Sequence, residues 1–249
     1  MSLTGLNRNC GPLDLNGAKV IAQLGQSLDG RVAAASGESR YINGPGGLTH
    51  LHQLRAAVDA VLVGVGTVLA DDPRLTVRHA RGASPARVII DLKQRLPRDA
   101  ICLAEDEAEI VIIGPRRDLP RLVTFLDVDM VNGVACPSAV LAGLRDHGFE
   151  RVLVEGGPTT IAHFMRAGVI DMMHLLVAPM IIGAGPIGLD LPHHVRLDQS
   201  LKPRTVCRPL AGGDVLFECD FRHGADTRSC DTADSVEADT RLLVMEDKG

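Results

Sequence analysis

Short apolar runs alternate with amphipathic segments along most of this 249-residue chain. Runs rich in valine, isoleucine and leucine predict buried strands, because the strands of a parallel sheet are covered on both faces. We expect such strands at 19–24, 60–65, 86–91, 109–114, 151–155 and 172–179. Weaker patterns predict a strand around 128–131 and another at 31–33, just after the Asp29-Gly30 turn.

Helices are predicted between several of these strands. Leucines and a valine recur at three- and four-residue spacing over 45–58, which is the pattern of an amphipathic helix. A second helix is expected over 138–147, with Ser138 as its cap. A third begins with Pro158 at its first position and Gly157 as the residue entering it.

The chain changes character near its C-terminal end. Two alternating stretches, 203–209 and 215–221, flank Gly212-Gly213 and predict a β-hairpin. The expected fold class is therefore α/β, with a mixed, mostly parallel sheet, flanking helices and a C-terminal antiparallel hairpin. We divide the chain into a loose lead-in (1–17), one domain (18–222) and an acidic flexible tail (223–249).

Composition narrows the functional classes. The net charge of −5 comes from interspersed acids and bases, which argues against a nucleic-acid-binding surface. No apolar run approaches the roughly 18 residues needed to cross a bilayer, and no signal peptide is expected. The six cysteines are scattered without a C-x-x-C pair, which suits free thiols in a reducing cytoplasm. His50 and His52 fall on different faces of the predicted helix, so a shared metal ion is not expected.

The stretch 60–78 carries the densest chemistry. Its valine-rich strand ends in Gly64 and Gly66, where another backbone or a ligand can approach closely. A hydroxyl, two carboxylates and a cation follow: Thr67, Asp71, Asp72 and Arg78. Leu69 stands where a dinucleotide fingerprint needs its third glycine, so a Rossmann turn is not expected. A strand with an ordinary turn is the open alternative.

The segment after the 151–155 strand is a second candidate site. Glu155 ends an apolar strand, where a carboxylate is costly to bury without a partner. Gly156-Gly157 then leads into the Pro158 helix, whose N-terminus favours anions such as phosphate. A tight turn that uses glycine for geometry alone remains the alternative.

Four motifs occur in order: QSLDG at 26–30, SGES at 36–39, VGVGTVLADDPRLTVR at 63–78 and VEGGPTT at 154–160. With them the sequence resembles the pyrimidine reductases of riboflavin biosynthesis. These include the reductase domain of a bifunctional deaminase-reductase and stand-alone archaeal and fungal-type diaminopyrimidine reductases. The resemblance implies a dihydrofolate-reductase-like fold, a homodimer, NADPH as cofactor, and reduction of a phosphoribosylamino-pyrimidine to its ribityl form. The zinc signature of a deaminase domain is not found in the sequence.

The resemblance also implies site residues. The substrate's phosphoribosyl end is assigned to Ser39, Arg55, Arg78 and the backbone near Leu75. The pyrimidine is assigned to Glu155, which is also the predicted catalytic residue, and to Gln23. The cofactor is assigned to Gly25, Tyr41, Thr67, Asp71, Gly156, Gly157, Pro158, Thr159, Thr160 and Ile161. Lys93, with Arg95, is added from its place after the 86–91 strand, where it can hold a 2′-phosphate, so NADPH is expected to be preferred over NADH. By themselves, Arg55 and Ser39 are also compatible with a solvated cation and an ordinary loop serine.

Gln23 stands where the bifunctional bacterial enzymes carry a lysine. Its amide both donates and accepts hydrogen bonds, so it can face an exocyclic amino group of a 2,5-diamino substrate. Two other functions stay open: a related oxidoreductase acting on a different heterocycle or carbonyl, and a non-catalytic sensor of NADP(H). The proton donor is not identified by the sequence.

Overall fold

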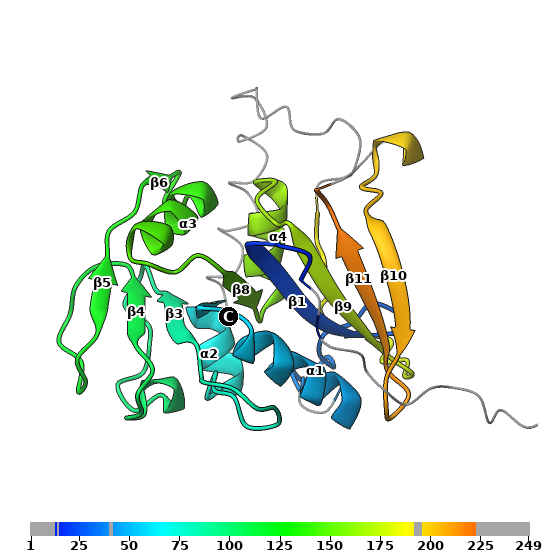
Figure 1. Ribbon diagram of the computed structural model, residues 1–249, viewed down its shortest axis with the longest axis horizontal. Coiled ribbons are helices and arrows are strands. Elements are labelled where there is room, and N and C mark those ends of the chain that lie inside the picture. Colours follow the sequence, from blue (N-terminus) through cyan, green and yellow to red (C-terminus); the bar gives the residue numbers. More distant parts are fainter. Residues whose placement is uncertain (1–12, 14, 40–41, 192–195, 223–249) are drawn as a thin grey trace, which may run out of the picture.

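The computed structural model describes residues 13, 15–39, 42–191 and 196–222 (Figure 1). The strands are β1 (Val20–Ser27), β2 (Ala60–Gly64), β3 (Ala86–Ile90), β4 (Ile110–Ile113), β5 (Thr124–Leu126), β6 (Met130–Val131), β7 (Val134–Ala135), β8 (Val152–Glu155), β9 (Met172–Ala178), β10 (Arg204–Pro209) and β11 (Val215–Asp220). The helices are α1 (Pro45–Ala56), α2 (Val65–Asp71), α3 (Pro137–Asp146) and α4 (Pro158–Arg166), with short 3-10 turns η1 (Ile101–Leu103) and η2 (Leu197–Gln199).

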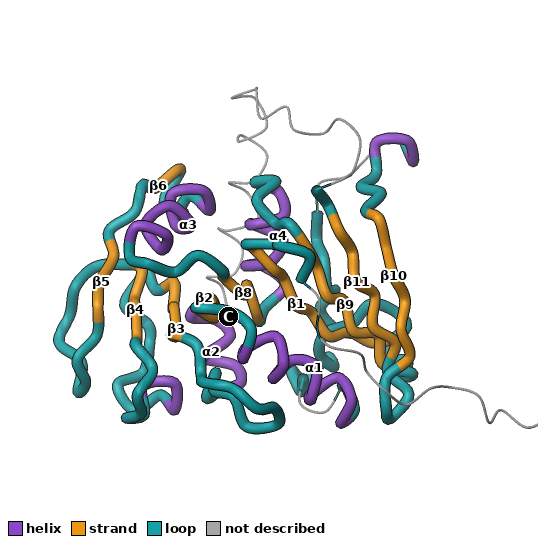
Figure 2. The backbone as a smooth tube through the Cα atoms, viewed as in Figure 1, coloured by secondary structure: helices purple, strands orange, loops and turns teal. Residues whose placement is uncertain are grey.

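Nine of the strands form one sheet in the order β10-β11-β9-β1-β8-β2-β3-β4-β5 (Figure 2). From β9 to β5 neighbouring strands are parallel, whereas β11 pairs antiparallel with both β9 and β10. β6 and β7 form a separate two-stranded ribbon. The mixed, mostly parallel sheet with a C-terminal hairpin is confirmed.

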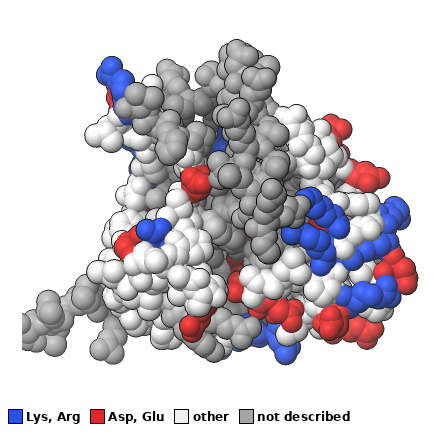
Figure 3. Space-filling model, turned by 180° about the vertical axis from the view of Figure 1, so that it is seen from behind, with Lys and Arg blue, Asp and Glu red and all other residues white. Residues whose placement is uncertain are grey.

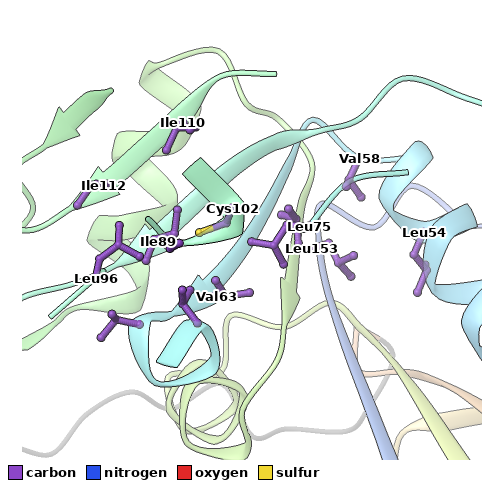
Figure 4. Packing of buried hydrophobic residues seen from close by; sticks show 14 of the residues in the cluster. Leu54, Val58, Val63, Leu75, Ile89, Leu96, Cys102, Ile110, Ile112 and Leu153 are labelled. Carbon is purple, nitrogen blue, oxygen red and sulfur yellow. The ribbon is translucent and has the colours of Figure 1, made fainter. Parts of the chain in front are cut away.

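Alternate side chains of the sheet feed two apolar clusters, one on each face. On one face Leu54 of α1 and Val68 of α2 join the cluster that Figure 4 shows. On the other, Leu144 of α3 and Phe164 of α4 join the second cluster. Burying one such side chain stabilises the fold by about 1.5–3 kcal/mol. The parallel strands therefore read as continuous apolar runs because both of their faces are covered.

The centre of the 60–78 stretch differs from its prediction. A helix, α2, follows β2 directly, with Gly64 as its N-cap, where the sequence predicted a strand running on to residue 65. The ordinary turn that was the alternative is not found there either. The reason is burial: Val65 and Val68 face the core when the segment is helical. Asp72, before Pro73, ends the helix in the left-handed conformation with φ 41°. The segment 75–78, in which apolar and polar residues alternate, forms no strand.

Three smaller predictions also need correction. Helix α3 begins after Cys136, with Pro137 in its first turn, so Ser138 is not its cap. The segment 31–33 makes only an isolated bridge, between Arg31 and Ile187. The strand expected around 128–131 is reduced to β6, and the strand that joins the main sheet is β5.

The entry of α4 matches the prediction: Gly157 is its N-cap and Pro158 begins it. Gly168, with φ 65°, follows its end. Leu13 and Leu15, from the predicted lead-in, pack on the first cluster. The predicted tail, 223–249, lies outside the described residues. On the face seen in Figure 3, acidic and basic side chains intermingle rather than form a patch of one sign.

Candidate active site at the strand ends

A polar row crosses the centre of the sheet beneath helix α1. Glu155 of β8 lies opposite Gln23 of β1, which in turn lies opposite His174 of β9. Residues paired in this way point to the same face of a sheet. All three side chains are buried. Because of the strand pairing, the two residues predicted to hold the pyrimidine, Gln23 and Glu155, are neighbours.

Arg55 lies over this row, near the end of α1, and pairs with Glu155. Its Nε donates to Glu155 Oε2 at 2.8 Å, and its Nη2 donates to Oε1. The two residues are 4% and 8% exposed. A buried carboxylate is stable here because the guanidinium meets both of its oxygens. Sequence reasoning treated Arg55 and Glu155 as separate ligands; the substrate role of each stays a prediction.

The loop after α2 carries the predicted phosphate contacts. Leu75 is fully buried with φ 58°, a left-handed conformation that is unusual for leucine. Arg78 follows it, and its pKa is lowered by partial burial and by the positive charges of Arg55 and Arg74. These cations therefore share one region, which suits an anionic group of a ligand. Sequence reasoning missed Arg74, although the 63–78 motif contains it.

Ser39 and Asp71, predicted for substrate and cofactor respectively, meet each other. The Ser39 hydroxyl donates to Asp71 Oδ1 at 2.6 Å. This contact joins the SGES loop to the last residue of α2. The structure thus brings the two predicted sets of residues together at one place.

Thr67 of α2 supports the turn between β8 and α4. Its Oγ1 accepts a hydrogen bond from the Gly157 N–H at 2.8 Å. Gly156 has φ 106°, and a Cβ there would lie 2.7 Å from Thr67 Oγ1, so only glycine fits. Gly157 offers α4 no side-chain cap, which leaves the positive end of the helix dipole available to an anion.

The other cofactor residues predicted in this turn and in the start of α4 differ in where their side chains lie. Thr160 approaches Gly64, where a Cβ would lie 2.6 Å from its Oγ1. The close approach predicted at Gly64 is therefore made by α4, while a Cβ at Gly66 would meet nothing within 4 Å. Thr159 is exposed, but Ile161 is fully buried in the second cluster, so only its backbone can face a ligand.

Gly25 lies two residues beyond Gln23 on β1, at the same end of the sheet as the α4 turn. A Cβ at Gly25 would collide with the amide of Asn43, a residue that sequence reasoning missed. The Asn43 Nδ2 is buried and makes no hydrogen bond within the described part of the chain. Such a donor calls for a partner, which a ligand supplies. Tyr41, the aromatic predicted beside the cofactor, lies outside the described residues.

Lys93 is exposed in the loop after β3. The carboxylate of Asp91 turns inward and accepts hydrogen bonds from the backbone N–H groups of Arg95 and Leu96 at 2.8 and 2.9 Å. This leaves the side chains of Lys93 and Arg95 at the surface.

The described residues contain no cluster of three or more His, Cys, Asp or Glu side chains arranged to hold a metal ion. None of their helices has the length and apolar character required to cross a membrane.

Comparison with known proteins matches residues 18–205 to the family model described as the RibD C-terminal domain. The riboflavin biosynthesis protein PYRR of Zea mays is 35% identical over 176 residues, which are 69% of this chain and 28% of that protein. The 2,5-diamino-6-ribosylamino-4(3H)-pyrimidinone 5′-phosphate reductase of Methanothermobacter thermautotrophicus is 38% identical over 172 residues, or 66% of this chain and 79% of that protein.

Among solved structures, RibD of Acinetobacter baumannii superposes with a TM-score of 0.70 at 30% sequence identity. The match covers 81% of this chain and 57% of that one. The chain therefore spans less than a third of the maize relative and little more than half of the Acinetobacter protein.

Proposed function

Because the chain belongs to the family of the RibD C-terminal domain, we propose that it is an NADPH-dependent reductase of riboflavin biosynthesis. Its substrate is a ribosylamino-pyrimidine 5′-phosphate, whose ribosyl group becomes a ribityl group. The name of the Methanothermobacter relative describes a reductase of a substrate of this class. The dihydrofolate-reductase-like fold that the resemblance implied agrees with the observed sheet and helices.

One observation carries the proposal: three chemically distinct groups converge on the same end of the sheet. Arg78 and Arg74 supply positive charge for the substrate's phosphate. Glu155, fixed by Arg55, and the neighbouring Gln23 supply hydrogen bonds to the pyrimidine. The turn before α4 supplies a helix N-terminus for the pyrophosphate of the cofactor.

The donor set fits a nicotinamide cofactor. Thr67 and Gly157 shape the turn before α4, and Asn43 offers a buried Nδ2 beside Gly25 that has no partner among the described residues. NADPH, when bound, supplies the hydride for C1′ of the opened sugar. We expect NADPH to be preferred over NADH, because Lys93 and Arg95 are exposed where they can contact a 2′-phosphate.

The chain's own task is alignment. Arg55 holds the Glu155 carboxylate in one orientation through two hydrogen bonds, so the pyrimidine meets a fixed acceptor. The Ser39–Asp71 contact holds the SGES loop against α2. Fixing both reactants replaces an encounter in solution with a single bound geometry, which lowers the barrier.

We further propose that the protein works as a homodimer in a reducing cytoplasm. β10 is an edge strand of the sheet, and Val206 on it is 51% exposed. Leu197 and Leu201, just before it, are 88% and 40% exposed, and exposed apolar side chains of this kind favour association. Among the described cysteines, Cys102, Cys136, Cys207 and Cys219 are all free thiols. Sedimentation velocity on the full chain tests the dimer.

The decisive experiment mixes the full chain with NADPH and either the 2,5-diamino pyrimidine phosphate or its deaminated counterpart. Loss of NADPH absorbance that depends on the pyrimidine, with a ribityl product by mass spectrometry, is the expected result. NADPH binding without oxidation would instead support a sensor. Oxidation with other heterocycles or carbonyls, but neither pyrimidine, would support a related oxidoreductase. Repeating the assay with NADH gives the cofactor preference as a ratio of kcat/KM.

A further inference from the structure

His52 of helix α1 has no role in the function proposed above. Its ring is fully buried, and its Nδ1 accepts a hydrogen bond from the backbone N–H of Arg78 at 2.9 Å. An accepting Nδ1 carries no proton, so the neutral ring is protonated on Nε2. A side chain of α1 therefore holds the backbone of the residue that we assign to the substrate's phosphate.

Arg55, three residues after His52, holds the same loop from the same face of α1. Besides pairing with Glu155, it donates from Nη1 to the carbonyl oxygen of Thr76 at 3.0 Å. Between these contacts, the Val77 N–H donates to Ser84 Oγ at 3.0 Å. Backbone groups of three successive residues are thus bonded to side chains, although their alternating sequence resembles a strand.

The loop needs this support because its backbone is strained. Leu75 has φ 58° and points into the first apolar cluster near Leu153 and Cys102 (Figure 4). A non-glycine residue in this region persists only where surrounding contacts fix it. The buried leucine holds one end of the segment, and His52 holds the other.

The protonation state of His52 suits an acceptor. Its pKa is lowered from 6.5 to about 4, mainly by burial and then by Arg55, His79 and Arg78. His79 packs edge-on against the ring, with centroids 4.7 Å apart. At neutral pH the Nδ1 lone pair therefore stays available to the Arg78 N–H.

We infer that His52 is a positioning residue, whose Nδ1 fixes the peptide of Arg78 so that the Arg78 guanidinium meets the phosphate of the substrate. Its effect passes entirely through the 75–78 loop. The part of this inference that concerns the phosphate rests on the proposed function. The part that concerns the loop does not.

The test compares His52→Leu, which removes the acceptor, with His52→Asn, whose Oδ1 can take the place of Nδ1. For His52→Leu we expect KM for the phosphorylated pyrimidine to rise about tenfold, the effect of one misplaced charge-assisted contact. We expect kcat and the Kd for NADPH to stay near wild type. His52→Asn should restore KM. His52→Gln, whose amide lies one methylene farther from the backbone, should not restore KM. If His52→Leu fails to fold, the comparison of His52→Gln with His52→Asn tests the inference instead.

Amide hydrogen exchange on the ligand-free protein gives an independent readout. The Arg78 N–H should exchange faster in His52→Leu than in wild type and His52→Asn. If wild-type turnover is normal but KM and the exchange of the Arg78 N–H are unchanged in His52→Leu and His52→Gln, the inference about His52 is overturned and the proposed function is not affected. Absence of wild-type turnover would reject the proposed function together with the phosphate part, while the exchange comparison would still decide whether His52 holds the loop.

Discussion

Arg55 and Glu155 form a buried ion pair that ties the end of helix α1 to the end of strand β8. The same arginine reaches Thr76, so one side chain connects a helix, a strand and the loop that carries Arg78. Both partners have lost their water, and each satisfies the other. The pair is therefore expected to matter to the fold as well as to the ligand.

Replacing one partner should destabilise the protein strongly. In Glu155→Ala the guanidinium of Arg55 stays buried without its carboxylate, which we expect to cost about 3–5 kcal/mol of unfolding free energy. Urea unfolding followed by circular dichroism measures it. The double variant Arg55→Met/Glu155→Leu should recover most of that stability and none of the reductase activity. A double variant no more stable than Glu155→Ala would count against the pair as the source of the loss.

The turn before α4 should bind the cofactor through charge as well as shape. Gly157→Asp places a carboxylate at a helix N-terminus that should receive pyrophosphate, and we expect NADPH binding to be lost. Gly157→Asn has the same size without the charge, so it should retain much more affinity. Fluorescence titration with NADPH compares the two variants. Equal affinity in both would remove the pyrophosphate from this turn.

Arg78 should affect the substrate and not the cofactor. Arg78→Ala removes a charge-assisted contact worth about 1.5–3 kcal/mol, so KM for the phosphorylated pyrimidine should rise about 10- to 100-fold. Arg81→Ala removes an exposed arginine from the same loop and serves as the control. Steady-state kinetics together with NADPH titration separate the two ligands. Equal damage to substrate and cofactor binding by Arg78→Ala would mean that its place is misassigned.

Gln23 should influence which pyrimidine is accepted. It lies between Glu155 and His174, and its amide can accept from an exocyclic amino group. We expect the 2,5-diamino substrate to be used at least as well as the deaminated one, and Gln23→Lys to shift the ratio of kcat/KM toward the deaminated one. Side-by-side assays of both substrates measure this. A wild-type enzyme that strongly prefers the deaminated pyrimidine would exclude Gln23 from the selection.

Acid should destabilise the fold through a buried histidine pair. His50 Nε2 lies 2.8 Å from His174 Nδ1, and their rings are stacked. Burial, followed by the positive charge of Arg208, lowers the pKa of His50 to about 4. Burial, followed by His50 and then Arg208, lowers the pKa of His174 to about 3. Below pH 6.5 the unfolded chain therefore binds protons on these histidines that the folded protein does not bind. The contribution of the neutral pair to the free energy of unfolding is fully present above that pH. It decreases as the pH drops toward 4, by up to about 1.4 kcal/mol per pH unit for each histidine.

Urea midpoints at pH 7 and pH 5 measure this dependence. The double variant His50→Leu/His174→Leu should show a smaller difference between the two pH values than wild type. His147→Gln, which replaces a histidine paired with Glu109 nearer the surface, should keep the wild-type difference. The same acid dependence in both variants would assign it to other groups.

The sequence was sufficient to predict the strands of the main sheet other than β5, the helix entered from Gly157 and the final hairpin, because each has a local pattern. Helix α2 was missed because its valines and glycines resemble a strand, and only burial of Val65 and Val68 favours the helix. The ion pair was missed for another reason. Its partners stand 100 residues apart, and no local spacing records that contact.

The placement of β1 has a consequence for biosynthesis. This strand, the first that the structure describes, lies inside the sheet between β8 and β9, so Val20 pairs with Val152 and Ile21 with Met172. β1 cannot pair with β8 or β9 along either edge until the ribosome has made most of the chain. A nascent or truncated product therefore displays an apolar strand with two unpaired edges, a substrate for chaperones and a template for aggregation. Premature stop codons before β8 should accordingly yield insoluble fragments instead of partly active ones.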